Sequence, residues 1–126
     1  MTKVGDLMES RLIAVSRVSS LSTAIRLMRG ARVTAIPVLD GRTLYGVLTL
    51  DEAERQLERW GDERNVGSMH LRKIFVEERD RPEKAAKIMV ENKLNRLPVV
   101  DSIIEMRCVG VVSSTEIAQR HKKKLF

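Results

Sequence analysis

The sequence predicts an α/β fold made of two β-α-β-β-α repeats that are related by pseudo-two-fold symmetry. An internal repeat is the first observation, because an offset of 61 residues places Met8 over Met69 and Pro37-Val38 over Pro98-Val99. Each copy also alternates short apolar runs, typical of strands, with apolar residues at helical spacing. The length of 126 residues suits one domain, and two copies are too few for a solenoid. We therefore expect one compact module with two equivalent clefts.

The first repeat, residues 1–61, is expected to run strand, helix, strand, strand, helix. Ser22 is a suitable N-cap for the first helix, and Gly30 can end it. Asp40-Gly41 is a strong signal for a hairpin. The expected elements are a strand at 12–15, a helix between Ser22 and Gly30, strands at 33–39 and 44–48, and a helix at 50–60.

The second repeat, residues 62–126, follows the same plan with different residues. Asp80 is expected to cap its first helix, with Pro82 in the first turn, and the last helix is expected to start near Thr115. Because proline cannot donate to a sheet ladder, the strands with Pro37 and Pro98 are expected at a sheet edge or at a bend. The expected strands are 74–76, 97–100 and 109–112.

Composition limits the classes of partner. Only four residues are aromatic, so the core is expected to be aliphatic, and a nucleic-acid platform of stacked aromatics is not expected. The net charge is +6, but Arg120 and residues 122–124 supply four of these charges, so the body is nearly balanced. Nucleic-acid binding through this basic tail is a less favoured alternative. No apolar run approaches a membrane span and no signal peptide opens the chain, so we expect a cytoplasmic protein without a membrane partner.

The sequence does not predict an enzyme, a catalytic residue or a metal site. His70 and His121 have no Cys, His or carboxylate nearby at metal-ligand spacing. Cys108 is the single cysteine and is expected to be a buried, inert thiol in a reducing compartment. The Gly-rich phosphate loop, the GxSxG motif and the HExxH motif do not occur in the sequence.

Six short motifs, in order and repeated, resemble the cystathionine β-synthase (CBS) domain, which occurs in tandem pairs called Bateman modules. The resemblance covers residues 4–121. It implies an α/β sandwich that forms a homodimer and regulates another protein, here an unidentified partner, without being catalytic or requiring a cofactor. It also implies an adenosine-containing ligand, such as AMP, ADP, ATP or S-adenosylmethionine, in clefts between the repeats. The motifs are VGDLM (4–8), AIPVLDG (35–41), GVLT (46–49), VGSM (66–69), RLPVVD (96–101) and GVVS (110–113).

The resemblance also implies the residues that bind the ligand. In the family, a Thr/Ser-x-x-Asp stretch after the Gly-hydrophobic strand of one repeat holds phosphate and ribose. The other repeat supplies its first strand and the residues before Pro-Val, which hold adenine. Carried over by position, one cleft would use Thr49, Asp51 and Glu52 with Ile74, Asn95 and Arg96, and the other would use Ser113, Thr115 and Glu116 with Ile13, Thr34 and Ala35.

These residue types suit a nucleotide. A carboxylate can accept hydrogen bonds from both hydroxyls of a ribose, and a helix N-terminus presents free N–H groups to an anion. Arg96 could bind a phosphate through two charge-assisted hydrogen bonds.

This chain departs from the family pattern because Glu52 and Glu116 stand where Asp is expected. Two interpretations remain open: the glutamates bind ribose, or they are first-turn acids that stabilise helix N-termini. The hydroxyl-rich segment 113–115 favours the second cleft slightly. A ligand-free structural module that only dimerises is therefore a further alternative to the sensor.

Overall fold

The computed structural model describes residues 1–124, with the side chains of residues 1–119. Contacts divide the chain into two compact units. The continuous unit consists of Ile13–Lys73, and the split unit consists of Met1–Leu12 together with Ile74–Phe126. Each unit holds a three-stranded mixed sheet and its own helices, which confirms the α/β class predicted from the sequence.

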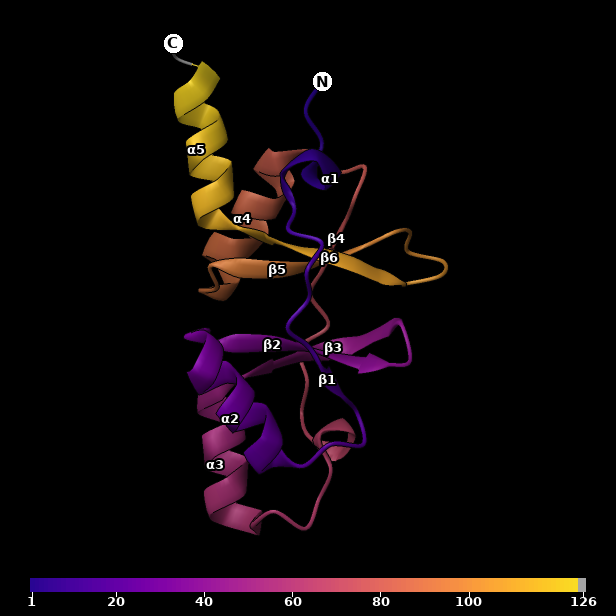
Figure 1. Cartoon of the computed structure of the whole chain (residues 1–126), viewed down its shortest axis with the longest axis vertical. Coiled ribbons are helices and arrows are strands. Elements are labelled where there is room, and N and C mark those ends of the chain that lie inside the picture. Colours follow the sequence, from indigo (N-terminus) through magenta and orange to yellow (C-terminus); the bar gives the residue numbers. More distant parts are fainter. Residues whose placement is uncertain (125–126) are drawn as a thin grey trace. The chain divides into compact units, whose positions relative to one another are not determined.

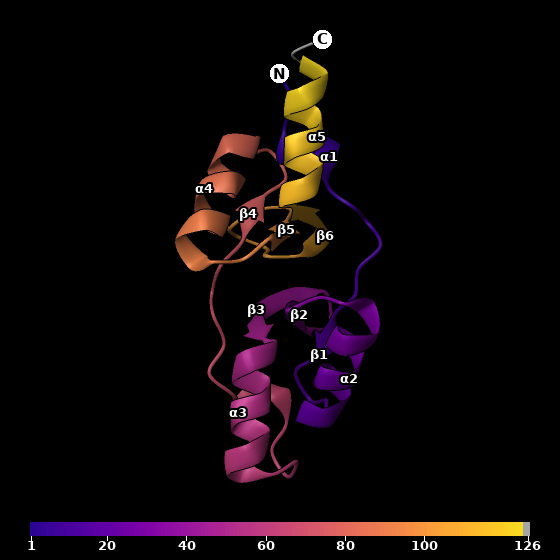
Figure 2. The same cartoon turned by 90° about the vertical axis from the view of Figure 1, so that its left-hand side faces the viewer.

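The continuous unit has its strands in the order β1-β2-β3, with β1 parallel and β3 antiparallel to the central β2. Its two long helices cover one face of this sheet (Figures 1 and 2). The predicted β2–β3 hairpin is present, but Asp40 ends β2 and pairs with Thr43, so the turn residues are Gly41 and Arg42. Gly41 has φ +63°, a conformation suited to glycine. The elements are β1 Val15–Ser16, α2 Leu21–Ala31, β2 Ala35–Asp40, β3 Thr43–Thr49, α3 Leu50–Trp60 and the 3₁₀ turn η1 Val66–Ser68.

The split unit repeats this topology, with the strand order β4-β5-β6 and the same parallel and antiparallel pairings. The predicted β-α-β-β-α order is therefore present twice, although β1 and β4 are each only two residues long. None of the helices in the described residues is long and apolar enough to cross a membrane. The elements are α1 Val4–Leu7, β4 Val76–Glu77, α4 Pro82–Asn92, β5 Arg96–Val100, β6 Cys108–Ser113 and α5 Ser114–Lys124.

Both prolines lie in a central strand rather than in an edge strand. Pro37 pairs with Val47 across the hairpin, but the parallel pairing with β1 begins one residue later, at Val38. Pro98 lies in the same position of β5. On the side that faces β1 or β4, the central strand has no partner yet at the proline residue. No backbone N–H donor is needed there, so proline is tolerated.

Each unit contains an aliphatic core between its sheet and its helices. In the continuous unit, Leu21, Met28, Ile36 and Leu48 are fully buried. The core of the split unit is made by side chains from all of its strands, from α1 and α4, and from the start of α5. These residues include Val4, Val76, Met89, Leu97, Val99 and Val112, with Ile117 packed against them.

The first segment of each repeat packs in the unit that holds most of the other repeat. Val66 belongs to the core of the continuous unit, where its N–H donates to the Ser19 carbonyl at 2.7 Å. The N–H of Val4, in the split unit, donates to the Asp80 carbonyl at 2.8 Å. The two units are defined by contacts, whereas the boundary between residues 61 and 62 divides the two sequence repeats. That boundary stays a prediction.

Two glycines let these leading segments cross the sheets closely. A Cβ atom on Gly46 would lie 2.7 Å from the Cβ of Leu71. On Gly110 it would lie 2.7 Å from the Met8 sulfur and 2.9 Å from the Glu9 carbonyl oxygen. Any larger residue would push the crossing segment away, so the repeated glycine is a packing requirement of this fold.

Several predicted helix ends were wrong by one or two residues. Ser20, not Ser22, caps α2, because its hydroxyl accepts the Thr23 N–H. Gly30 lies inside α2, which ends at Arg32 in the left-handed conformation. Asp80 does not cap α4, whose N-cap is Arg81 without a side-chain hydrogen bond.

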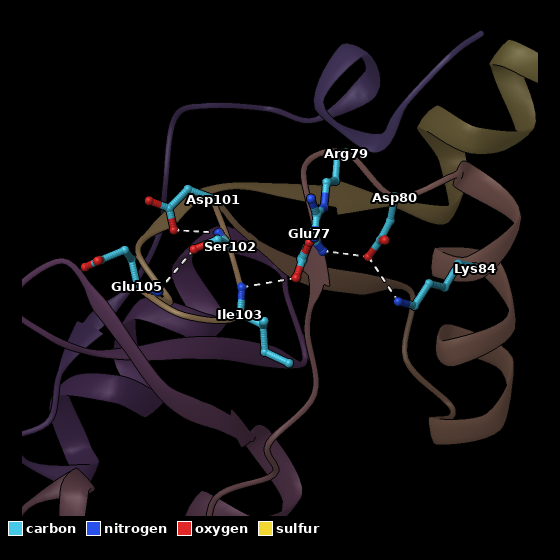
Figure 3. A network of polar contacts seen from close by, with 8 residues as sticks. All are labelled: Glu77, Arg79, Asp80, Lys84, Asp101, Ser102, Ile103 and Glu105. Carbon is cyan, nitrogen blue, oxygen red and sulfur yellow. Dashed lines mark hydrogen bonds and ion pairs between the residues drawn. The ribbon is translucent and has the colours of Figure 1, made fainter.

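The connection from β5 to β6 is longer than the first hairpin and is held by polar side chains (Figure 3). The Asp101 carboxylate accepts the Ser102 N–H at 2.7 Å. Glu77, which is 9% exposed, accepts the Ile103 N–H at 3.1 Å and the Arg79 Nε–H at 2.7 Å. A buried carboxylate from β4 therefore fixes the position of this loop.

Candidate ligand-binding site

The two helix starts predicted to bind the ligand are built in the same way. Thr49 pairs with Ala35 in the sheet, and the next residue, Leu50, donates its N–H to the Thr34 carbonyl at 2.8 Å. Thr34, the residue just before β2, therefore supplies a carbonyl acceptor to the first N–H of α3, a group that otherwise has no partner inside the helix. Thr34, Ala35 and Thr49 are consequently brought together in the continuous unit.

The split unit has the equivalent arrangement. Arg96 pairs with Ser113, and Ser114 donates its N–H to the Asn95 carbonyl at 2.9 Å. Residues that we assigned to two different clefts therefore lie side by side within one unit. The assignment of these residues to particular clefts stays a prediction.

Ser113 and Glu116 form a closed capping box at the start of α5. The Ser113 hydroxyl accepts the Glu116 N–H at 3.2 Å. One Glu116 carboxylate oxygen, Oε1, accepts both the Ser113 N–H at 2.9 Å and the Ser113 Oγ–H at 3.0 Å. The Ser113 residue is only 8% exposed. In this structure Glu116 thus performs the helix-stabilising role that we considered as one of its two interpretations.

Thr49 and Glu52 share the spacing but not the hydrogen bonds. Thr49 Oγ1 accepts the Glu52 N–H at 3.3 Å, as an N-cap does. The Glu52 carboxylate points along the helix instead, where it accepts hydrogen bonds from Arg55 at 2.6 Å and from Gln56 at 2.9 Å. The hydrogen bond from Arg55 holds the pKa of Glu52 below its usual range, and Gln56 lowers it further.

The remaining predicted residues differ in exposure. Thr115 and Asp51 are exposed at the second position of their helices, beside the hydroxyl caps. Arg96 is exposed, and its guanidinium makes no ion pair with any side chain of residues 1–119. Ile13 is 44% exposed just before β1, whereas Ile74 is half-buried against the core of the split unit.

Other reactive side chains do not assemble into a site in the described part of the chain. No group of three His, Cys, Asp or Glu residues able to hold a metal occurs there. Cys108 is buried, and burial raises the pKa of its thiol. His70 is exposed. His121 and the basic tail from Arg120 onward lie outside the residues whose side chains are described, so the structure does not address their predicted roles.

A groove of about 970 Å³ opens in the split unit, between α1, α4 and α5. Its lining is mainly apolar, and it includes Val90, which is 79% exposed. The groove touches the candidate site only at Ser114. Its lining residues include Leu7, Met89, Val90, Leu94, Ile117 and Ala118.

The capping box was visible in the sequence as the pattern Ser-x-x-Glu over residues 113–116. Sequence reasoning noted the helix-stabilising role of Glu116 without identifying its partner. The same pattern occurs as Thr49-x-x-Glu52, where the Glu52 carboxylate accepts hydrogen bonds from Arg55 and Gln56 and none from Thr49. The motif alone therefore does not determine which donors the carboxylate binds.

Comparisons with known proteins cover the whole chain. The CBS domain model matches residues 4–58 and residues 66–122. The CBS domain-containing protein YhcV of Bacillus subtilis is 30% identical over 94% of this chain and 84% of its own length. Inosine-5′-monophosphate dehydrogenase of Korarchaeum cryptofilum is 31% identical over 86% of this chain. The chain spans about a quarter of the length of the dehydrogenase relatives that it matches.

Solved structures show the same fold. The crystal structure of CBSX2 in complex with AMP is 26% identical, covers 100% of both chains and has a TM-score of 0.81. CBSX2 is a CBS-pair protein from Arabidopsis thaliana. The two family matches coincide with the two β-α-β-β-α repeats and with the repeated glycine and proline positions. The chain therefore belongs to the CBS domain family and carries two copies of that domain.

Proposed function

We propose that this protein is a regulatory module that binds an adenosine-containing ligand and is not itself catalytic. Its place in the CBS family and its full-length likeness to a protein solved with AMP support this class of ligand. Mononucleotides and S-adenosylmethionine share an adenosine group, so the proposal concerns that group and one anionic substituent. No cofactor is needed for such a role.

The observation that carries the proposal is the sheet register that places Arg96 opposite Ser113. Arg96, whose guanidinium makes no ion pair with the described side chains, is therefore the cross-strand neighbour of Ser113, the residue that precedes α5. Arginine binds phosphate through two parallel hydrogen bonds, and a helix start favours negative charge. In the continuous unit the equivalent residue is Ala35, which offers no charge.

We propose roles for the other residues at these helix starts. Asn95 and Thr34 precede the central strands and would contact the base together with the apolar Ile13 and Ile74. Thr115 would add a hydroxyl next to the phosphate. Glu116 and Glu52 would accept hydrogen bonds from the ribose hydroxyls, and Asp51, which is exposed beside Thr49, would be a further acceptor.

Isothermal titration of the nucleotide-stripped protein with AMP and with adenosine tests this proposal. Arg96→Ala should weaken AMP binding about tenfold or more and change adenosine binding much less, because only AMP carries a phosphate. Lys87→Ala removes a positive charge from the exposed face of α4 in the same unit and should leave both affinities unchanged. Absence of heat with either ligand, at protein concentrations well above about 10 μM, would contradict the proposal.

We also propose that the protein acts as a homodimer on a separate protein partner in the cytoplasm. The apolar groove of the split unit, with the exposed Val90 at its side, is the surface that we assign to the second copy. The buried free thiol of Cys108 fits a reducing compartment.

Light scattering after size-exclusion chromatography tests the dimer. Val90→Glu should convert dimer to monomer, because it places a charge in an apolar interface. Val18→Glu is the matched control, since Val18 is 69% exposed, belongs to the continuous unit and does not line this groove. A monomeric wild-type protein, or a Val90→Glu variant that stays dimeric, would rule out this assignment.

A further inference from the structure

We propose that Glu116 is a specificity-determining residue that disfavours ligands carrying a phosphate at Ser113. The inference rests on the proposed function, because it concerns the same helix start. The Glu116 carboxylate occupies the two Ser113 donors that a phosphate would use. Glu116 would then act as a latch, meaning that its carboxylate blocks the Ser113 donors from a phosphate, as well as a helix cap.

The geometry of the capping box carries this inference. A single oxygen of Glu116 accepts from the Ser113 N–H at 2.9 Å and from the Ser113 hydroxyl at 3.0 Å. The same hydroxyl accepts the Glu116 N–H, so its donor and one of its acceptor positions are in use. A phosphate oxygen that approached Ser113 would meet a negative carboxylate, and both donors of Ser113 itself would already be bound to that carboxylate. The carboxylate must therefore move before a phosphate can bind there.

The other helix start shows how such a carboxylate can be held away. Glu52 is bound to Arg55 and Gln56, and the Thr49 hydroxyl proton has no acceptor among the described residues. The residue equivalent to Arg55 in the split unit is Gln119, which carries no charge. Glu116 therefore lacks the cation at i+3 that draws Glu52 along its helix.

The second carboxylate oxygen separates the effect on phosphate from the effect on ribose. Glu116 Oε2 accepts no hydrogen bond from the described residues, so a ribose hydroxyl could bind it while Oε1 keeps the cap. Adenosine would then be tolerated, whereas AMP with its phosphate at Ser113 would require the box to open. The ratio of the AMP affinity to the adenosine affinity reports on the blocking of phosphate alone, because any contact between Glu116 and ribose affects both ligands.

The test is calorimetric titration of wild type and Glu116→Gln with AMP and with adenosine. Glutamine keeps the Ser-x-x-Gln capping box but removes the negative charge. The variant should raise the affinity for AMP relative to adenosine about tenfold. The control Glu91→Gln removes an exposed carboxylate of α4 and should leave this ratio unchanged.

A second measurement follows the Ser113 amide resonance during titration with inorganic phosphate. The resonance should shift at a lower phosphate concentration in Glu116→Gln than in wild type. If AMP and adenosine bind but the ratio stays equal or falls in Glu116→Gln, the latch is refuted and the proposed function stands. If neither ligand binds to wild type or to any variant, both proposals are refuted.

Discussion

The two units place the same pair of residues, a hydroxyl and a glutamate three residues later, at the same point of the same topology. In the split unit Glu116 turns back to Ser113, and in the continuous unit Glu52 turns forward to Arg55 and Gln56. The difference lies in the neighbours on the helix rather than in the fold. A site residue can therefore keep its place in a repeat while its hydrogen bonds change.

The largest effect is expected from filling the space at the repeated glycines. Gly46→Ala and Gly110→Ala should each lower the free energy of unfolding by about 2–3 kcal/mol, because the new Cβ would overlap a crossing segment. Gly30→Ala is the control, since nothing lies within 4 Å of its Cβ and alanine favours a helix. Urea unfolding followed by circular dichroism measures all three. A neutral effect at both crossing glycines would show that the segments are not held at this distance.

The next effect concerns the two hydroxyl caps. Ser113→Ala should cost about 1–2 kcal/mol, because it removes both hydrogen bonds of the buried hydroxyl. Thr49→Ala removes one bond of 3.3 Å and should cost about 0.5–1 kcal/mol. The same urea unfolding experiment compares the two. Equal costs would mean that the extra bonds to Glu116 add nothing to stability.

An effect of smaller size and opposite sign, a gain in the free energy of unfolding, is expected at two helix ends. Arg32 and Lys93 adopt the left-handed conformation, with φ 57° and 55°, where side chains other than glycine are disfavoured. Arg32→Gly and Lys93→Gly should each raise the free energy of unfolding by about 0.5–1 kcal/mol. Thermal unfolding should give equal gains, because the two positions are equivalent. A loss at either position would show that its side chain has a stabilising contact.

The smallest effect is the pH dependence of the Glu52 interaction. Because Arg55 lowers the pKa of Glu52 in the folded state, its stabilisation is present above the ordinary glutamate pKa of about 4.3 and is lost as pH falls through the lowered folded value. The free energy of unfolding of wild type should therefore exceed that of Glu52→Gln by about 0.2–0.5 kcal/mol at pH 7 and by less at pH 3. Arg55→Gln should remove most of this dependence. Urea unfolding at both pH values checks it, and a difference that does not change with pH would contradict the assignment.

Much of the fold could be predicted because its signals are local or repeated. The repeated glycine, proline and hairpin positions were enough to predict both sheets and the order of the helices between the strands. The cap of α2 was misplaced because Ser20 and Ser22 are equally suitable in sequence, and a distant residue decides between them. Asp62 accepts hydrogen bonds from both the N–H and the hydroxyl of Ser22, which leaves Ser20 to cap the helix.

The candidate site was harder to predict than the fold. The two helix starts were predicted from the sequence, but the hydrogen-bond partners of each carboxylate depend on side-chain geometry. The grouping of Asn95 with Ser113 follows from sheet register, which a motif does not show. The packing of Val4 and Val66 in the unit of the other repeat likewise has no signature in a single sequence.

The exchange of leading segments has a consequence for the order in which the chain folds during synthesis. The continuous unit, Ile13–Lys73, is complete in one stretch and can close while the rest of the chain is still being made. The split unit must wait, because Val4 at one end of the chain packs with Val112 near the other. Residues 1–12, which include α1, are made early, whereas the strands that they pack against are made late. Residues 1–12 therefore lack their packing partners until translation has passed about residue 113. A chain released too early would therefore contain a folded continuous unit and an unpacked segment, residues 1–12, whose exposed apolar side chains are suited to capture by a chaperone.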